Sequence, residues 1–379
     1  MSLELFSKDN LDTLVWPATP DASYARKMLE PFFKHGVQRY IQNVHNTELF
    51  LLKLDNTLLP LTLSHFHPEN SYVCSPYSHY VLYGGYEETK HIGNPLLGKA
   101  IRIALGPVAT LLRWLEFDRV VLVNNWLLST NLYPGLNEPQ VEQLVRALPE
   151  LFPERAIVFR SVDAYQNPQV FSSLLRAGYR MVLSRQVYYQ EPQQALKKKQ
   201  VKLDKRVMAK SQLRLENLEA ASDAEIARLL ALYNQLYLEK YSYFNPQFSE
   251  AFLRLSLENG LVSYQVLKMD ERIVAVLGFF WRGKVMTQPI FGYDLGLSQD
   301  YGLYRLLSLQ TLLEGARRGL SVHASAGVGE FKRLRGGVRV TEYNAVFDRH
   351  LPSYRRLPWQ GLEGVSSRIA VPLFKKYGL

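Results

Sequence analysis

The sequence predicts an α/β protein of the α+β kind, built from two related domains that each have a mixed, mainly antiparallel sheet flanked by helices. Two repeated patterns carry this prediction. A strand–turn–strand pattern occurs as LKLDNTLLPL at residues 52–61 and as LKMDERIVAV at residues 267–276. A helix-ending pattern follows each copy, as LRAGYR at residues 175–180 and as LRGGVR at residues 334–339. The common order and the strand-like runs on either side favour a duplicated domain over two chance matches.

The second copy has the clearer element order, which starts with a short strand at residues 213–218. Ser222 with Glu225 three residues later is the capping box that begins a helix, and Gly260 ends a second helix. Three strands follow, with Asp270 at the bend between the first two, as expected of a hairpin. The turn LGLSQDYG then leads into a long helix, a strand, a short glycine-flanked helix and a last strand. The predicted order is therefore β-α-α-β-β-β-α-β-α-β.

The domain boundaries follow from the most basic part of the chain. Lysine and arginine dominate residues 194–210, which contain no glycine or proline. We predict an N-terminal domain at residues 1–193, a basic connector at residues 194–212 and a C-terminal domain at residues 213–379. The connector is either a solvated surface or a contact for phosphates and nucleic acid. The N-terminal copy also contains an inserted, largely apolar segment at residues 93–115, which is predicted to be helical.

Composition limits the possible partners. The chain has 379 residues, a net charge of +10 and a pI of about 9.4. The basic surplus favours anionic partners, although solubility alone would explain it too. The single cysteine, Cys74, excludes an intrachain disulfide and suits a reducing compartment. Because no leader-like or membrane-spanning apolar run is present, we expect a soluble, cytoplasmic protein without stable membrane insertion.

The turn before the long helix, Gln299-Asp300-Tyr301-Gly302-Leu303-Tyr304, together with the element order, resembles the GNAT acyltransferase superfamily. The resemblance implies an acyl-CoA or another acyl thioester as donor. It also implies that the preceding strand binds the pantetheine arm, and that the amides of the turn bind the pyrophosphate. Tyr304 departs from the small residue of the family pattern. The donor-binding residues that the resemblance implies are Gln288, Ile290, Phe291, Gln299, Gly302 and Leu303.

Two tandem domains joined by a basic segment resemble the Fem-type peptidoglycan aminoacyltransferases and the BioF2-like acyltransferases. Phe331-Lys332 with Gly336 resembles their Phe-Lys-x-x-x-Gly signature. This implies transfer from a thioester of coenzyme A or of an acyl-carrier protein to a small-molecule or peptide amine. A charged tRNA is the alternative donor. Lys332 and Arg335 are the cationic candidates for donor phosphates. The first copy lacks the turn, so it is implied to shape the acceptor cleft.

Acyl transfer to an amine also requires groups that move protons. Asp294 and Tyr293 follow the strand at its ligand-binding end, and Tyr304 is a candidate general acid. Each of the three also has an ordinary structural explanation, as a turn residue or a packed aromatic side chain. Asn124 and Asn125, at the end of a first-copy strand, are candidates for lining the acceptor site.

Two further expectations concern ligands and catalysis. His65 and His67 would share one face of a strand, but no third ligand is evident in the sequence, so no metal is expected. The altered turn and the missing tyrosine at Phe331 leave open a non-catalytic module that binds an acyl-carrier protein, nucleic acid or a membrane surface. The oligomeric state stays open.

Overall fold

Two compact units form the computed structural model, which describes residues 2–87 and 95–370. The first unit comprises Met1–Ser184, Ser242–Gln247 and Glu342–Leu379, and the second comprises Arg185–Tyr241 and Phe248–Thr341. Two strands, β6 (Arg180–Gln190) and β12 (Gly337–Phe347), therefore begin in one unit and end in the other. The boundaries predicted at residues 193 and 213 stay a prediction.

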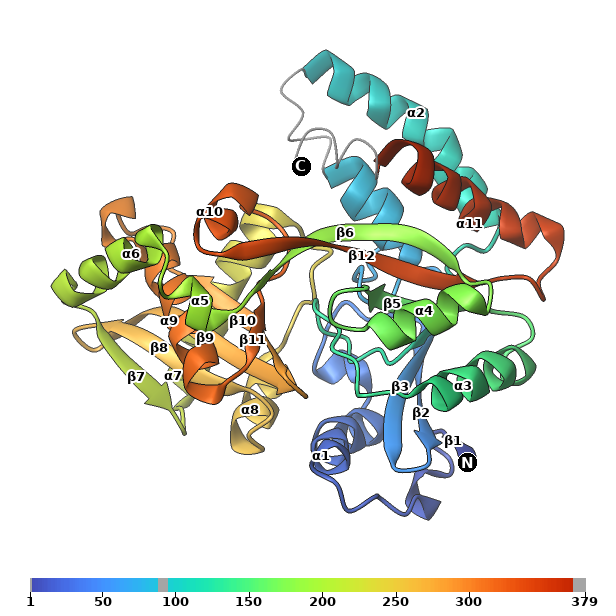
Figure 1. The fold of residues 1–379 in the computed structure, drawn as a ribbon, viewed down its shortest axis with the longest axis horizontal. Coiled ribbons are helices and arrows are strands. Elements are labelled where there is room, and N and C mark those ends of the chain that lie inside the picture. The colour runs from blue at the N-terminus through green and yellow to red at the C-terminus, as the bar shows by residue number, and fades with distance from the viewer. Residues whose placement is uncertain (1, 88–94, 371–379) are drawn as a thin grey trace. The chain divides into compact units, whose positions relative to one another are not determined.

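The first unit is built on a mixed sheet (Figure 1). Its neighbouring strands are antiparallel, except that β4 and β5 are parallel. The strands, in sheet order, are β1 (Leu3–Phe6), β2 (Thr47–Leu54), β3 (Thr57–Ser64), β4 (Val120–Val123), β5 (Ala156–Val162) and the second part of β12. The helices are α1 (Pro20–His35), a π-helical segment (Ser78–Glu87), α2 (Pro95–Trp114), α3 (Glu138–Leu151), α4 (Pro168–Arg176) and α11 (Ser353–Val365).

Alternating side chains of β4 supply the cores on both faces of this sheet. Val121 and Val123 pack into a cluster with α3 and α4, whereas Val120 and Leu122 pack into a cluster with α2 and α11. Burial on both sides explains the continuous apolar sequence of β4, since a parallel strand covered on both faces has no solvent side. The helix predicted within residues 93–115 is present as α2; residues 93 and 94 lie outside the described residues.

The second unit is also built on a mixed sheet. Four antiparallel strands lead to a parallel pair, β10 with β11, and β11 pairs antiparallel with the end of β6. The strands are β7 (Arg214–Leu218), β8 (Ser263–Met269), β9 (Arg272–Arg282), β10 (Val285–Tyr293) and β11 (Ser321–His323). The helices are α5 (Pro192–Ala195), α6 (Lys199–Lys210), α7 (Asp223–Asn234), α8 (Glu250–Glu258), α9 (Leu303–Arg318) and α10 (Gly329–Leu334). The predicted order and fold class are confirmed.

The repeated patterns have the same local structure in both copies. The two hairpins turn at Asp55 and Asp270, which have positive φ angles of 52° and 51°. The two helix endings place Gly178 and Gly336 at φ angles of 82° and 83°, directly before β6 and β12. Glycine adopts this conformation without steric cost, so both helices can stop sharply there.

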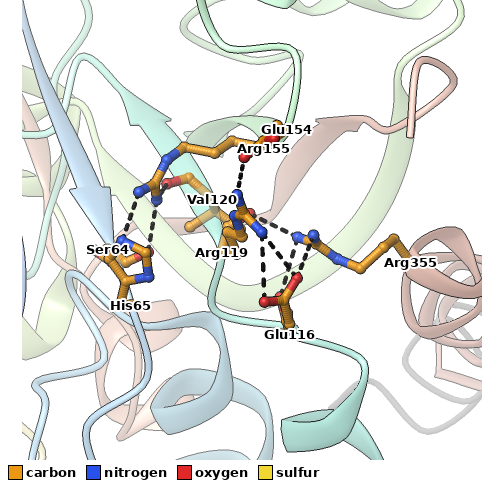
Figure 2. Close-up of polar contacts among 8 residues, drawn as sticks. All are labelled: Ser64, His65, Glu116, Arg119, Val120, Glu154, Arg155 and Arg355. Atoms are coloured by element: carbon orange, nitrogen blue, oxygen red, sulfur yellow. Dashed lines mark hydrogen bonds and ion pairs between the residues drawn. The ribbon is translucent and has the colours of Figure 1, made fainter. Parts of the chain in front are cut away.

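An arginine network ties several segments of the first unit together (Figure 2). Arg155 donates to the carbonyls of Ser64 at 3.0 Å and of Val120 at 3.4 Å, linking the end of β3 to the start of β4. Arg355, on α11, donates to a Glu116 carboxylate oxygen at 2.7 Å and to the Arg119 carbonyl at 3.3 Å. These contacts hold α11 onto the loop that precedes β4.

Candidate functional site

The parallel pair in the second unit separates almost at once. β10 and β11 pair only through Val285 with Ser321 and Met286 with Val322. On its other side, β10 shifts its register with β9 between Thr287 and Ile290. This irregularity contains a proline, Pro289, which has no N–H to give to a neighbouring strand. The remainder of β10, up to Tyr293, is thus extended backbone that does not pair with β11.

The predicted donor-binding residues of β10 lie in this separated part. Ile290 and Phe291 are buried, and Gln288 is half-buried. The Gln288 Nε2 group is itself buried, and among the described residues it has no hydrogen-bond partner. A buried donor without a partner is costly in a folded protein, so this amide is suited to meet a bound ligand or an ordered water.

The N-terminus of α9 lies at the turn that was predicted to bind the pyrophosphate. Ser298 caps a short 3-10 turn at Gln299–Tyr301 by accepting a hydrogen bond from the Asp300 amide at 3.2 Å. Gly302 then takes a left-handed conformation, with φ 60° and ψ 31°, and no described side chain caps α9 itself. The first amides of α9, from Leu303 onward, therefore remain available to an anion.

The backbone at Gly302 is not crowded by its neighbours. A side-chain carbon built there would have Val207 and Arg305 as nearest neighbours, each at 3.8 Å, an ordinary van der Waals distance. The positive φ angle, rather than crowding, is what favours glycine at this position.

Lys332 on α10 is buried against backbone carbonyls. Its side chain is 7% exposed, and Nζ donates to the carbonyls of Ala326 at 2.6 Å and Ser325 at 3.2 Å. Burial, with repulsion from Arg185, lowers the pKa of the amine to about 7. No ion pair joins it to a carboxylate of the described residues. Near neutral pH the Lys332 amine is therefore only partly protonated. A bound anionic ligand would raise its pKa and favour the charged form.

An aromatic cluster connects the segments that carry the predicted site. The Tyr304 ring lies 4.9 Å from Phe331, 5.6 Å from Phe291 and 6.3 Å from Tyr293. β10, the first turn of α9 and α10 are therefore brought together, as the sequence prediction requires. Burial raises the pKa values of Tyr304 and Tyr293, so both phenols keep their protons at neutral pH.

Asp294 is held by its neighbours. Arg228 donates to its Oδ2 at 2.7 Å, Arg272 forms a second ion pair, and the Gly296 amide donates to Oδ1 at 2.9 Å. Burial alone would raise the pKa of this carboxyl, but the hydrogen bonds and the positive charges outweigh it, so the pKa lies below its usual value. The geometry makes Asp294 a weak base and an anchor for the end of β10.

Arg335 is engaged in a buried ion pair that the sequence did not predict. Its Nε and Nη2 donate to Asp204 at 2.6 and 3.0 Å, and Arg305 donates to the same carboxylate at 2.9 Å. The Arg335 guanidinium also lies over the Phe331 ring at 3.4 Å. A contact of Arg335 with donor phosphates, as predicted, would require this pair to open. The signal in the sequence was the single acidic residue in a basic helix, three positions after the buried Val201.

The basic segment predicted as a connector is a helix that borders the site. Val207 of α6 lies next to Gly302, and Asp204 binds Arg305 of α9. The opposite side of the segment carries a row of exposed cations, Lys197, Lys198, Lys199, Lys202, Lys205, Arg206 and Lys210. Positive charge therefore extends away from the Gly302 turn.

Asn124 and Asn125 have their amides occupied within the first unit. Asn125 donates to Thr62 Oγ1 at 2.8 Å and to the Val73 carbonyl at 2.9 Å, and accepts from Arg160 at 3.0 Å. Asn124 accepts from the Trp126 ring at 3.0 Å. Both side chains are fully buried. These contacts favour a structural role; their predicted role in lining the acceptor site stays a prediction.

The two histidines that were predicted to share a strand face have different partners. His65 lies 2.7 Å from the Arg155 guanidinium (Figure 2). His67 instead stacks on His45, with ring centroids 4.2 Å apart. His45, His67 and Glu69 together offer three candidate metal-ligand atoms within 4.8 Å of one another. In the same unit, burial raises the pKa of the Cys74 thiol to about 12, which excludes it as a thiolate nucleophile at neutral pH.

Comparisons with known protein families and solved structures agree with this fold. The family model described as "Acetyltransferase (GNAT) domain" matches residues 194–333. The structure of FemX is 7% identical and matches with a TM-score of 0.53, covering 96% of this chain and 100% of FemX. L-PGS from Bacillus licheniformis is 13% identical and matches with a TM-score of 0.45, covering 60% of this chain and 77% of its own. No curated protein sequence matches the chain.

A tandem GNAT protein from the clavulanic acid biosynthesis pathway is 11% identical, with a TM-score of 0.42, and the match covers 93% of this chain and 100% of its own. The predicted resemblance to the GNAT superfamily is confirmed for residues 194–333 by the family model. The chain shares the fold of FemX along nearly its whole length.

Proposed function

We propose that this protein is an N-acyltransferase that moves an acyl or aminoacyl group from an acyl thioester to an amine. One observation carries the proposal: β10 leaves β11 after two residue pairs, and the next helix, α9, begins without a side-chain cap. An opened strand followed by free helix amides offers extended backbone for a pantetheine-like arm and an anion site for its pyrophosphate.

Different residues of the second unit bind different parts of the donor. Backbone groups of Gln288 to Phe291 hydrogen-bond the extended arm of the donor, as an added strand would. The amides from Leu303 onward take the pyrophosphate beside Gly302, whose own N–H donates to the Gln299 carbonyl at 2.9 Å. Gln299 lies on the exposed side of the same turn, and Lys332 supplies the positive charge. Coenzyme A, or the equivalent arm of an acyl-carrier protein, supplies the activated acyl group when bound.

The reaction needs few groups from the protein. The neutral amine of the acceptor attacks the carbonyl carbon, a C–N bond forms, and the C–S bond breaks. Backbone amides of the opened strand stabilise the negative charge on the carbonyl oxygen. The Tyr304 phenol, kept protonated by burial, gives a proton to the leaving sulfur and regains one from the acceptor nitrogen through Tyr293 or water. Asp294 fixes the end of β10 that carries Tyr293.

A charged tRNA is the second candidate donor, and the position of α6 favours it. Val207 of α6 lies beside the Gly302 turn, and a donor longer than coenzyme A would continue to the exposed cations on the other side of this helix. A phosphate backbone bound there would make affinity depend steeply on salt.

Thermal shift with coenzyme A, an acyl-CoA and a charged tRNA tests the proposal. We expect a donor to stabilise the wild type and Gly319→Trp, but not Gly302→Trp. Gly319 is a matched control, because it has the same left-handed conformation (φ 67°), open surroundings and a place at the other end of α9. If no donor stabilises the wild type, the transferase proposal fails and a binding module is the better reading.

Charge reversal at Lys202 and Lys205 distinguishes the two donors. For a tRNA donor, affinity and its salt dependence both fall, whereas the matched reversal of Lys34 and Arg146 changes neither. An unchanged salt slope in the α6 variant would rule out the RNA contact.

A further inference from the structure

α2 of the first unit has two apolar faces, and only one of them is buried. Ala109 and Leu112 pack into the cluster that also contains Trp359 of α11, and Figure 1 shows the two helices next to each other. Large apolar side chains on the rest of the helix face solvent. They are Leu96, Leu97, Ile103, Val108, Leu111 and Trp114.

The exposed residues form one continuous stripe. Successive residues of a helix are 100° apart, so Leu96, Ile103 and Trp114 fall within about 20° of one direction. These three are 78%, 68% and 82% exposed. The other exposed apolar residues lie on the adjoining side, away from Ala109. A soluble surface rarely exposes so extended an apolar patch, and such patches mark an interaction site.

The charges of α2 are all of one sign. The helix contains Lys99, Arg102 and Arg113 and no acidic residue. At 100° per residue, these cations lie together between the buried face and the exposed stripe. An apolar stripe with a basic flank and a tryptophan is the composition of helices that lie in the interface of an anionic bilayer.

We propose that α2 docks this protein on the surface of a membrane that contains anionic phospholipids. The helix lies in the plane of the interface, with Leu96, Ile103 and Leu111 among the acyl chains. Trp114 sits at the headgroup level, and Lys99 and Arg102 lie against the phosphates. Within residues 2–87 and 95–370, no helix combines the length and apolarity needed to cross a bilayer, which agrees with a peripheral position.

Vesicle co-sedimentation of the full chain tests this proposal. The probes are vesicles of phosphatidylcholine alone and of phosphatidylcholine with one quarter phosphatidylglycerol. We expect binding to the second kind that weakens as salt rises. Ile103→Asp should reduce the affinity tenfold or more, and Lys99→Ala about fivefold. Trp114 fluorescence should shift to the blue on binding, and this shift should be absent from Trp114→Phe.

Matched controls come from the same unit. Leu175 on α4 is 53% exposed, compared with 68% for Ile103, so Leu175→Asp removes another exposed apolar side chain away from α2 and should bind like the wild type. Circular dichroism melting checks that each variant is folded. Three results would overturn the proposal: no binding to phosphatidylglycerol vesicles, equal binding to both kinds of vesicle, or a self-association that Ile103→Asp abolishes while vesicle binding is absent.

Discussion

Each unit contains one parallel strand pair joined by a helix, and the two differ at every point where a donor would bind. In the first unit, β4 and β5 pair over four residues, from Val120 with Ala156 to Val123 with Phe159. In the second, β10 and β11 pair over two. The connecting helix α3 begins with a complete capping box of Asn137 and Gln140, whereas α9 begins at an uncapped glycine. A longer strand pair and a capped helix leave fewer backbone groups for a ligand.

The polar side chains beyond the strands show the same contrast. In the first unit, Arg160 fills the space by donating to Asn125 and to the carbonyls of Val73 and Leu128, at 2.5 to 3.0 Å. In the second, the buried Nε2 group of Gln288 has no partner among the described residues. The polar groups around Arg160 thus bind one another, whereas Gln288 Nε2 is left for a ligand. Four predictions test this contrast, from the largest expected effect to the smallest.

Asp204→Ala should give the largest loss of stability. It leaves Arg335 buried without a counter-charge, which costs about 3–5 kcal/mol in the free energy of unfolding. Urea denaturation measures it. Asp223→Ala is the control, since its ion pair with Arg254 is exposed and should cost less than about 1 kcal/mol. Equal losses would show that Asp204 is not a structural centre of the second unit.

Arg160→Met should destabilise the first unit by about 2–3 kcal/mol, because several buried groups lose a donor. Stabilisation of the protein by the donor should persist in the variant. If Arg160→Met instead removed donor binding while the fold remained, the assignment of the donor site to the second unit alone would be wrong.

Lys332 should make stability depend on pH. Its pKa is about 7 in the folded protein and about 10.4 when unfolded, so between these values the unfolded state binds more protons. The wild type should therefore gain stability as pH rises from 7 to 10, by up to about 1.4 kcal/mol per pH unit relative to Lys332→Met. Below pH 7 the difference should be constant. If the stabilities of the wild type and of Lys332→Met changed in parallel from pH 7 to pH 10, the lowered pKa of the buried Lys332 amine would be wrong.

Asn137→Ala should cost about 1 kcal/mol through loss of the helix cap, with donor binding unchanged. Ser298→Ala, which removes the cap of an exposed 3-10 turn before α9, should cost less than about 0.5 kcal/mol. Thermal unfolding of both variants measures the difference. A larger loss from Ser298→Ala would mean that α9 depends on that cap after all.

Local signals account for most of what the sequence could predict. Asp270 at the hairpin bend, Ser222 with Glu225, and Gly336 after a helix each fix a few backbone angles, so the element order followed from them. The ion pair of Asp204 with Arg335 joins segments 131 residues apart. Asp204 stands out as the single acidic residue of a basic helix, but nothing local identifies Arg335 as its partner. The opening of β10 depends on how far two strands stay paired, and no local pattern in the sequence reports that. The exposed stripe of α2 was not predicted either, because an apolar helix sequence does not show which face of the helix is buried.

The discontinuity of the first unit has a consequence for the growing chain. Its strand β5 is paired on one side by Tyr343 to Phe347 of β12, at the far end of the sequence. A ribosome delivers the N-terminal residues first, and domains generally fold as they emerge. Here the second unit is synthesised in full before the last strand of the first unit exists. During translation the sheet of the first unit therefore keeps an unpaired edge at β5 until β12 is made. The second unit is the first to have all its residues.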